Sequence, residues 1–366
     1  MIVIDARPLQ NTPLTGVGLV TQELIKRIKK PALTLFTSGI NKPFFETKNH
    51  IHASIPNKLL TLSTLIVKQP TIEQLIAKQS NEKVDAVFLP NSSIINIKQN
   101  TPLIVTIHDL SFLHIPKTYA TKNRWWHYAV NIKKLAHRAQ HIVAVSKTTA
   151  QDIIETLEIP EEKISIIHPG IEKQISTLQL PQIPSKYILI LSSIEPRKNL
   201  EILIGPLRDI LQQSKFNDVQ IILLGVLGYQ GKKILNHFIK ELGTTRFHYL
   251  GYVQHDIKQA LIANAYVTLY PSRFEGFGLP PLEGGIQGVP AIVSRIPSLQ
   301  ETLEETAWYA DPYRHDEWYE AIKTILENKN LHHEMSEKIK VQAEKFSWDT
   351  TISKYEKLLQ TYEHRY

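Results

Sequence analysis

The 366-residue sequence contains no cysteine. This absence excludes disulfide bonds, thiolate catalysis and metal sites that use cysteine ligands. It also fits a reducing compartment, and we expect a cytoplasmic protein.

Long apolar runs are missing as well. The longest, Tyr187 to Ile194 and Gln220 to Tyr229, are far shorter than the roughly 20 residues that a membrane-spanning helix needs. The first residues do not resemble a secretion signal, because a charge appears at Asp5 and the run before it predicts a strand. We therefore expect a protein that is soluble or bound peripherally to a membrane.

Length and composition predict two domains. The chain is 42% hydrophobic and 21% charged, as in an ordinary globular protein. A chain of 366 residues exceeds a typical single domain, so two domains are the natural division.

Positive charge is concentrated in the first half of the chain. Residues 1–175 carry 21 Lys and Arg against 13 Asp and Glu, a net charge of +8, whereas residues 176–366 carry 21 against 22. The densest basic stretch is Lys117 to Lys147, where cations alternate with Trp125, Trp126 and Tyr128. This stretch could bind anionic lipid headgroups, with tryptophans at the interface. Alternatively, it is a helix with an aromatic core face and a solvated basic face. A nucleic-acid partner is not expected, because no nucleic-acid-binding motif is present.

Strand patterns alternate with helical patterns along the whole chain. The expected strands are Ile2 to Asp5, Ala32 to Thr37, Ala86 to Leu89, Leu103 to His108, His141 to Val145, Tyr187 to Leu191, Gln220 to Leu224, Phe247 to Leu250, Ala265 to Tyr270 and Ala291 to Val293. Helical stretches are expected near Gly18 to Lys30 and Lys122 to Arg138. This alternation predicts an α/β protein with doubly wound, Rossmann-like parallel sheets. The stretch from Ile175 to Ser185 lacks periodicity and predicts a linker, so we expect domains at 1–175 and 176–345.

Two carboxylates flank a glycine turn in the segment Pro271 to Glu283. Gly276 and Gly278 follow a predicted strand, and a helix is expected to begin near Leu279 to Pro281. Glu275 would lie in the turn and Glu283 about one turn inside the helix. Carboxylates accept hydrogen bonds from sugar hydroxyls, and backbone amides can approach a ligand closely at glycine. Two solvated surface glutamates are the plainer interpretation.

Polar residues also follow other predicted strands, where ligands bind in such sheets. Gly16 and Gly18 form a loop after the first strand, which could approach a phosphate or be a simple tight turn. His108 and Asp109 end a later strand, and a histidine there can donate a hydrogen bond to a substrate or be structural. Arg197 and Lys198 are expected at a helix start, where two cations suit a diphosphate, although they could be an exposed basic turn.

Together these motifs resemble a known enzyme family. The series Glu195-Pro-Arg-Lys-Asn-Leu, Pro271-Ser-Arg-Phe-Glu-Gly-Phe-Gly-Leu-Pro-Pro-Leu-Glu283 and Gly288-Val-Pro-Ala-Ile-Val-Ser resembles the donor-binding domain of retaining glycosyltransferases of family four. The motifs Thr15-Gly-Val-Gly18, His108-Asp-Leu-Ser-Phe-Leu and Val143-Ala-Val-Ser-Lys147 are similar to the acceptor-side domain of that family. The resemblance implies the GT-B architecture, in which two such domains face each other across a cleft. It also implies a final helix, here 346–366, that crosses back to the first domain.

The resemblance also implies roles for individual residues. Arg197 and Lys198 would bind the diphosphate of a sugar nucleotide, and Glu275 would hold hydroxyls of the donor sugar. Phe277, Gly278 and Leu279 would contact the donor, Glu283 would hold the ribose, and His108 and Gly16 would approach the donor from the first domain. Asp109 and Gly18 are acceptor-side candidates. The implied chemistry needs no metal and no cofactor besides the nucleotide diphospho-sugar substrate.

The motif Ser193-Ile-Glu-Pro-Arg-Lys-Asn199 most resembles the corresponding motif of mannosyltransferases that build bacterial surface polysaccharide or lipopolysaccharide from GDP-mannose. The expected acceptor is an oligosaccharide or a lipid-linked saccharide, and the expected location is the cytoplasm or the inner face of the membrane. UDP-glucose and a UDP-N-acetylhexosamine remain alternative donors. Another GT-B enzyme and a non-catalytic nucleotide-sugar or glycan-binding protein remain alternative functions. A nicotinamide dehydrogenase is disfavoured, because no Gly-x-Gly-x-x-Gly fingerprint follows a strand.

Overall fold

The structure is a computed structural model that describes residues 1–10, 14, 16–41, 43, 49–172, 178 and 183–363. Thr15, most of the predicted linker from Ile175 to Ser185 and the last three residues of the chain lie outside these ranges. Within the described ranges, no helix combines the length and the apolar character that crossing a bilayer requires.

Internal contacts divide the chain into two units. The first unit contains Met1–Leu110, Lys122–Pro169 and Trp348–Tyr366, and the second contains Ser111–Thr121 and Gly170–Ser347. The short segment Ser111–Thr121 therefore belongs with the second unit, although the sequence placed it in the first domain.

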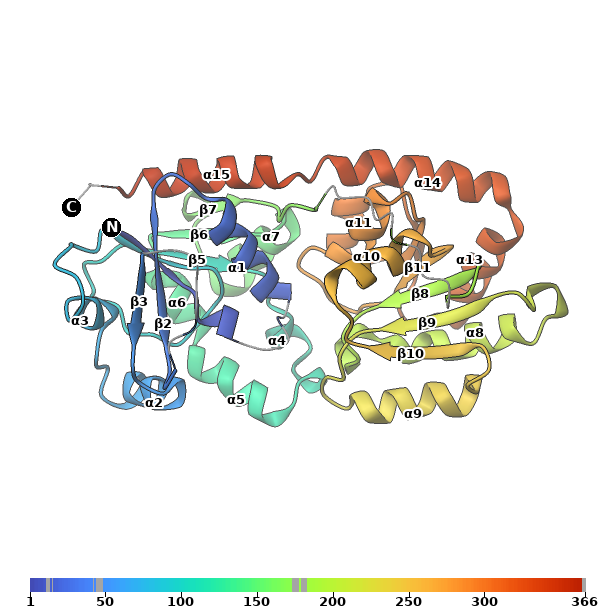
Figure 1. The fold of residues 1–366 in the computed structure, drawn as a ribbon, viewed down its shortest axis with the longest axis horizontal. Helices are drawn as coiled ribbons and strands as arrows, with labels where there is room; N and C mark the ends of the chain where they lie inside the picture. Colours follow the sequence, from blue (N-terminus) through green and yellow to red (C-terminus); the bar gives the residue numbers. More distant parts are fainter. Residues whose placement is uncertain are drawn as a thin grey trace. The chain divides into compact units, whose positions relative to one another are not determined.

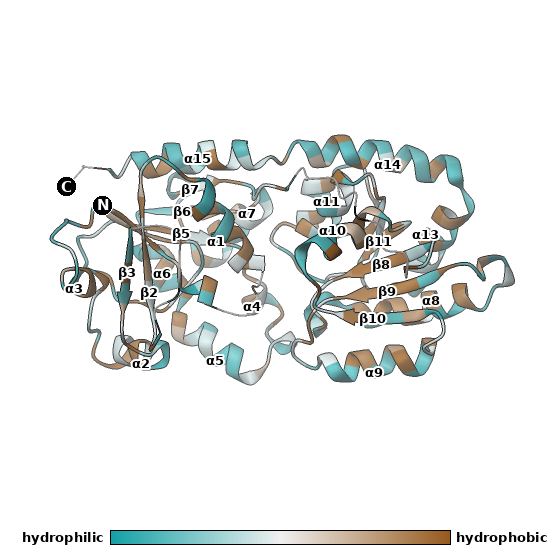
Figure 2. Ribbon diagram, viewed as in Figure 1, coloured by the Kyte–Doolittle hydropathy of each residue, from teal (hydrophilic) through white to brown (hydrophobic). Residues whose placement is uncertain are grey.

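The first unit is built on a parallel sheet in the order β3-β2-β1-β4-β5-β6-β7 (Figure 1). Its strands are β1 (Ile2–Asp5), β2 (Leu33–Ser38), β3 (His50–Ala53), β4 (Ala86–Leu89), β5 (Leu103–Ile107), β6 (His141–Ala144) and β7 (Ile164–Ile166). Its helices are η1 (Arg7–Gln10), α1 (Gly16–Arg27), α2 (Asn57–Ile66), α3 (Ile72–Ile76), α5 (Thr121–Val130), α6 (Ile132–Arg138), α7 (Lys147–Leu157) and η3 (Glu161–Lys163). The strands are strongly apolar (Figure 2), as expected of a parallel sheet covered on both faces.

The second unit contains a second parallel sheet, in the order β10-β9-β8-β11-β12-β13. Its strands are β8 (Tyr187–Leu191), β9 (Gln220–Leu224), β10 (Phe247–Gly251), β11 (Val267–Tyr270), β12 (Ala291–Ser294) and β13 (Trp308–Ala310). Its helices are α4 (Ser111–His114), η2 (Pro116–Thr118), η4 (Pro196–Lys198), η5 (Leu200–Leu203), α8 (Ile204–Leu211), η6 (Ser214–Phe216), α9 (Gly231–Leu242), α10 (His255–Ala263), α11 (Leu279–Ile286), α12 (Pro297–Leu303), α13 (His315–Glu327) and α14 (Lys329–Glu344).

Alternate residues of the central strand β8 fill the cores on the two faces of this second sheet. Ile188 and Ile190 belong to a core that includes side chains of α8, α9 and α13. Tyr187 and Leu189 belong to the opposite core, with side chains of α10. Burial on both faces explains why this strand is an unbroken apolar run. The loops of the candidate site emerge from the carboxyl end of this sheet.

The final helix, α15 (Trp348–Gln360), packs within the first unit (Figure 1). The buried Tyr355 hydroxyl lies 3.1 Å from the Thr106 hydroxyl, and its ring lies 5.5 Å from that of Phe88. The Glu356 carboxylate accepts a hydrogen bond from the Lys29 amide at 2.8 Å. The α/β fold with two Rossmann-like sheets and a returning C-terminal helix is therefore confirmed.

The helical stretch predicted near Lys122 to Arg138 is confirmed, and the structure divides it into two helices, α5 and α6. Asn131 separates α5 from α6 with a left-handed backbone at φ 47°, and its side chain caps α6 by accepting a hydrogen bond from the Lys134 amide. Asparagine adopts this conformation more readily than most residues, and it favours N-cap positions.

One interpretation of the same stretch, a helix with an aromatic core face, is wrong for α5. Of the ten described residues of α5, none is buried. Trp125 is 69% exposed and Tyr128 is 80% exposed. The aromatic side chains of α5 therefore lie on the surface beside its cations.

Candidate active site

Arg197 and Lys198 lie immediately beyond the carboxyl end of β8. They were predicted at a helix start, and they belong to η4, a single 3-10 turn that precedes η5 and α8. Asn199 interrupts the helix with a left-handed backbone at φ 54°, and α8 begins only at Ile204. The two cations therefore lie in a 3-10 turn and not in the first turn of an α-helix.

Asn199 holds this turn in place. Its amide nitrogen donates to the Pro312 carbonyl at 2.7 Å, and its amide oxygen accepts from the Arg273 guanidinium at 2.9 Å. The Arg273 amide in turn donates to the Arg197 carbonyl at 3.1 Å. Asn199 was not among the predicted site residues, although asparagine after a basic turn is a recognisable signal for a left-handed backbone.

Glu275 lies in the loop that follows β11, the strand next to β8 in the sheet. Its Oε1 accepts a hydrogen bond from Lys198 Nζ at 2.5 Å, and its Oε2 lies 3.4 Å from Arg197 Nη1. Arg197 also pairs with Glu195 at 3.1 Å. The two predicted clamp cations and the predicted sugar-binding carboxylate thus meet at one point at the edge of the second sheet.

Tyr270, the last residue of β11, joins this cluster and was not predicted. Its buried hydroxyl donates to Glu275 Oε1 at 2.8 Å and accepts from Lys198 Nζ at 3.1 Å. Sequence reasoning treated Tyr270 only as part of an apolar strand. Its position at the end of the strand, directly before the polar loop, could have identified it as a site residue, because ligands bind at the carboxyl ends of such strands.

The electrostatics of the cluster follow from burial and charge pairing. Burial alone would raise the pKa of Glu275, but the positive charges of Lys198 and Arg197 outweigh it and lower that pKa to about 2. Burial and the neighbouring Arg197 charge lower the pKa of Lys198, against the opposing effect of Glu275. Burial and the Glu275 charge raise the pKa of Tyr270, so its hydroxyl keeps its proton and remains a donor.

The turn after Glu275 needs a glycine at position 278, because of its backbone conformation and because a side chain packs closely against it. Gly278 has a left-handed backbone at φ 93°, and an added Cβ would lie 2.3 Å from a Leu299 side-chain carbon. Leu279 begins α11, as predicted, and the preceding Phe277 is buried with its ring 5.3 Å from that of Phe346. These contacts fix the loop between Glu275 and the helix.

Glu283 lies in α11, where its Oε1 accepts from Lys258 Nζ at 2.9 Å. This pair is partly exposed, with both side chains about one fifth accessible. A ribose that binds Glu283 would therefore share the carboxylate with Lys258.

His108 and Asp109 follow β5 in the first unit. His108 Nε2 lies 2.9 Å from the Pro90 carbonyl, to which it donates when protonated at that nitrogen. Burial lowers the pKa of His108, so the ring is neutral near pH 7. In that form Nδ1 can accept a hydrogen bond from a substrate hydroxyl, whereas the predicted donation would have to compete with Pro90.

Gly16 and Gly18 begin α1 in the first unit. An added Cβ on Gly16 would have no neighbouring atom within 4 Å, whereas on Gly18 it would lie 3.2 Å from the Leu14 side chain. Gly16 therefore leaves open space beside its backbone. Nothing in its packing against the described residues requires glycine there.

The acidic and histidine residues do not gather into a metal-binding arrangement. Across the part of the chain that the structure describes, no group of three or more His, Asp or Glu is placed to hold a metal ion. The polar cluster around Glu275 can instead bind an anion through its cations and a hydroxylated group through its carboxylate.

Two protein families match the chain in series. The family described as Glycosyltransferase Family 4 matches residues 14–174, and the one described as Glycosyl transferases group 1 matches residues 179–342. The chain is a glycosyltransferase with a family-4 domain, a group-1 domain and the GT-B fold.

Named relatives agree with this assignment. The glycosyltransferase is 27% identical to O-antigen chain mannosyltransferase B of Escherichia coli, over 98% of this chain and 100% of that one. It is 25% identical to O-antigen chain mannosyltransferase RfbU of Salmonella typhimurium, over 80% of this chain and 81% of that one.

Solved structures share the fold at lower identity. Sucrose-phosphate synthase from Thermosynechococcus elongatus has a TM-score of 0.78 at 16% identity, with 98% of each chain covered. WaaG, a glycosyltransferase of lipopolysaccharide biosynthesis, has a TM-score of 0.74 at 14% identity, over 98% of this chain and 99% of that one. HepE from Anabaena, in complex with UDP and glucose, has a TM-score of 0.72 at 17% identity, over 98% of this chain and 99% of that one.

Proposed function

We propose that this glycosyltransferase transfers a mannosyl residue from GDP-mannose to a saccharide acceptor, with retention at the anomeric carbon. The observation that carries the proposal is the buried cluster of Lys198, Arg197 and Glu275 at the carboxyl edge of the second sheet. The choice of mannose is supported by the two relatives above, both of which are O-antigen chain mannosyltransferases. The acceptor would be an oligosaccharide or a lipid-linked saccharide of surface polysaccharide or lipopolysaccharide synthesis.

In this proposal Arg197 and Lys198 bind the diphosphate. They neutralise the negative charge that grows on the β-phosphate as its bond to the sugar C1 breaks. The acceptor oxygen forms the new bond to C1 on the same face, and its proton passes to the leaving phosphate. Guanidinium and ammonium groups supply the positive charge, so the proposed step uses no metal ion.

Glu275 has two tasks in the proposal. In the unliganded cluster its carboxylate pairs with the buried Lys198 and, together with Glu195, with the partly buried Arg197. This pairing offsets the cost of burying the positive charges. When a diphosphate takes over as partner of the cations, Glu275 oxygens become available to hydroxyls of the donor sugar. The Tyr270 hydroxyl stays hydrogen-bonded to Glu275 and limits its rotation.

The variant Glu275→Ala tests this division of roles. We expect the rate of mannosyl transfer to fall roughly 100-fold or more, because an interaction with the reacting sugar is lost. The affinity for GDP alone, measured by calorimetry, should change much less. Equal losses in transfer and in GDP affinity would remove Glu275 from the sugar site.

UDP-glucose is a second candidate donor. The observation that favours it is the likeness to HepE, whose structure contains UDP and glucose. Transfer assays with GDP-mannose and UDP-glucose, each with the same purified protein, separate the two candidates. Preferred turnover of UDP-glucose would overturn the mannosyl assignment while leaving the cation clamp in place.

The proposal includes a peripheral location on an anionic membrane surface, through the stretch Lys117 to Lys147. Residues 110–151 contain seven Lys and Arg and no Asp or Glu. The tryptophans of α5 are exposed beside these cations, as at a membrane interface. Binding to vesicles that contain phosphatidylglycerol should weaken as salt is added, because exposed charges are screened. Binding that does not respond to salt would argue against this electrostatic contact.

A further inference from the structure

Helix α2 exposes an unusual amount of aliphatic surface. Leu62 is 52% exposed and Ile66 is 70% exposed, and Leu59, Leu65 and Val67 are exposed as well. Only Leu60 among the described residues of this helix is buried. Most of the apolar side chains of α2 therefore contribute nothing to the core of the first unit.

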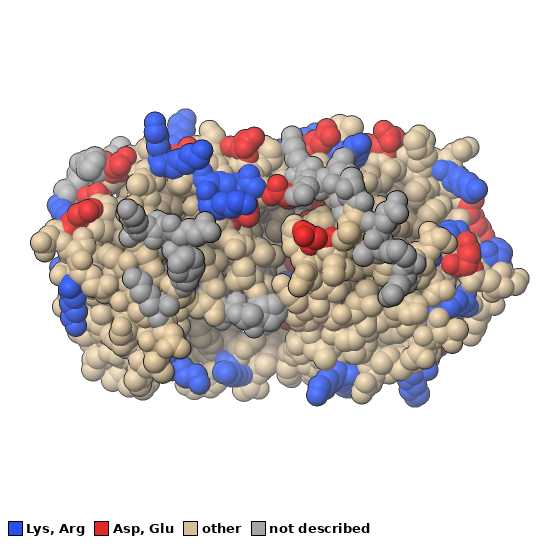
Figure 3. All heavy atoms as spheres, in the orientation of Figure 1, with Lys and Arg blue, Asp and Glu red and all other residues tan. Residues whose placement is uncertain are grey.

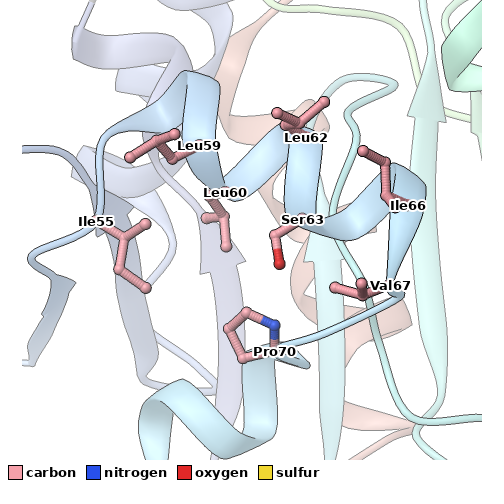
Figure 4. A pocket seen from close by; sticks show the side chains of 8 residues that line it. All are labelled: Ile55, Leu59, Leu60, Leu62, Ser63, Ile66, Val67 and Pro70. Atoms are coloured by element: carbon pink, nitrogen blue, oxygen red, sulfur yellow. The ribbon is translucent and has the colours of Figure 1, made fainter.

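The exposed side chains form one continuous feature. Leu59, Leu62 and Ile66 recur at intervals of three and four residues, which places them on one face of the helix. Together with Ile55, Val67 and Pro70 they line a shallow apolar groove (Figure 4). Contiguous apolar surface of this kind marks an interaction site more often than scattered exposed leucines do.

The chain segment that lines this groove carries charge of one sign. Residues 49–72 contain Lys58 and Lys68 and no Asp or Glu. Both lysines are exposed, one near each end of the helix. Along the lower edge of the first unit, where Figure 1 places α2 and α5, the charged side chains visible in Figure 3 are Lys or Arg. An apolar face flanked by cations is complementary to an anionic lipid surface.

We propose that the exposed face of α2 inserts into the interfacial region of an anionic bilayer, in addition to the membrane contact proposed for α5. This inference rests on the peripheral location that is part of the proposed function. It adds that α2 contributes hydrophobic binding to the bilayer. Short-range insertion of aliphatic side chains complements the long-range attraction of the α5 cations. Two signals of this kind together give stable membrane binding where one alone is marginal.

A second copy of the chain is a poorer occupant of the groove. Pairing two α2 faces would bring Lys58 and Lys68 of one copy towards the same lysines of the other. No acidic side chain of residues 49–72 is available to compensate. A lipid surface with phosphate groups carries the opposite charge and meets no such repulsion.

The test compares vesicle binding of the full chain with that of the double variant Leu62→Gln, Ile66→Gln. Both side chains are largely exposed, so we expect the thermal unfolding midpoint to remain close to that of the unsubstituted protein. Vesicles of phosphatidylcholine mixed with phosphatidylglycerol are sedimented with each protein at low and at high salt. The partition coefficient of the variant should fall roughly tenfold or more, because two aliphatic side chains no longer enter the interface.

Val341→Gln provides a matched control. Val341 is 62% exposed on α14, in the second unit, where residues of both charges, among them Lys340 and Glu344, are nearby in the sequence. This substitution removes an aliphatic side chain of similar exposure from a different helix. It should leave vesicle binding unchanged. The loss of binding would then belong to α2 and not to surface apolarity in general.

The possible outcomes separate this inference from the proposed function. Unchanged binding of the double variant overturns the α2 inference and leaves salt-dependent binding through α5 intact. Absence of binding by the unsubstituted protein at low salt overturns both membrane contacts, whereas donor turnover, measured separately, still decides the glycosyl transfer. A dimer in light scattering that the double variant converts to a monomer would assign the groove to a second copy and also overturn the inference.

Discussion

At the scale of single residues, the candidate site is a small network in which each group depends on its neighbours. Lys198 and Tyr270 both contact Glu275 Oε1, at 2.5 and 2.8 Å. Arg197 approaches the other carboxylate oxygen. The sequence motifs predicted the two cations and the carboxylate, because glycosyltransferase motifs are local in sequence. They did not predict Tyr270 or Asn199, whose contribution depends on contacts between segments far apart in the chain.

The variant Tyr270→Phe tests the part that the hydroxyl plays. We expect kcat to fall roughly 10- to 100-fold with KM nearly unchanged, because a hydrogen bond to a charged group contributes roughly 1.5–3 kcal/mol. GDP affinity should stay close to that of the unsubstituted enzyme, since the phosphate clamp is intact. Steady-state kinetics with the donor varied give both quantities, and a change confined to KM would contradict a positioning role.

Stability should depend on pH through Glu275. Its pKa is lowered from 4.5 to about 2 in the fold, so the ionised carboxylate stabilises the protein above the unfolded value. That contribution is lost as pH falls from about 4.5 towards 2, because the unfolded chain then binds the proton more readily.

The variant Glu275→Gln isolates this term. At pH 7 we expect it to lower the free energy of unfolding by roughly 1–3 kcal/mol, because it removes the buried counter-charge of Lys198 and leaves Arg197 paired with Glu195 alone. The difference from the unsubstituted protein should shrink as pH falls towards 2, where Glu275 itself becomes neutral. Denaturant titrations across this range measure it, and a constant difference would show that charge pairing is not the cause.

At the scale of elements, the central strands were predictable, whereas three of the four edge strands were not. The fourth edge strand, β10, was predicted as Phe247 to Leu250 and is observed as Phe247–Gly251. The bounds of β1, β4, β8 and β9 agree with the prediction, because these strands are buried on both faces and form unbroken apolar runs. The missed strands β3, β7 and β13 each lie at the edge of a sheet. They are three or four residues long, so they carry too little pattern to identify.

The join between the candidate site loop and α11 provides a prediction at this scale. Gly278→Ala should lower the free energy of unfolding by roughly 1–3 kcal/mol, because a left-handed backbone is strained in any other residue and the Cβ would meet Leu299. Gly16→Ala is the control, since its Cβ would meet nothing within 4 Å. Its effect should stay within about 0.5 kcal/mol. Equal effects of the two substitutions in chemical denaturation would contradict this account of the turn.

At the scale of the whole molecule, each half of the chain forms its own parallel sheet and core, and α15 returns to the first. The alternation of strand and helix patterns was sufficient to predict this class, because each sheet needs covering helices on both faces. The exposed face of α2 was not predicted. Its apolar sequence suggests burial, and only the three-dimensional contacts reveal that the helix leaves most of that surface uncovered.

The central claim is that Lys198 and its neighbours in the second unit bind the diphosphate of a sugar nucleotide, with GDP-mannose as the preferred donor. Titration calorimetry with GDP-mannose, UDP-glucose, UDP-N-acetylglucosamine, ADP-glucose and NAD tests it most directly, with Lys198→Ala alongside the unsubstituted enzyme. We predict selective binding of GDP-mannose and roughly tenfold or greater weakening in Lys198→Ala, because a charge-assisted phosphate contact is lost. Equal affinity of the two proteins for GDP-mannose, or binding of NAD alone, would contradict the claim.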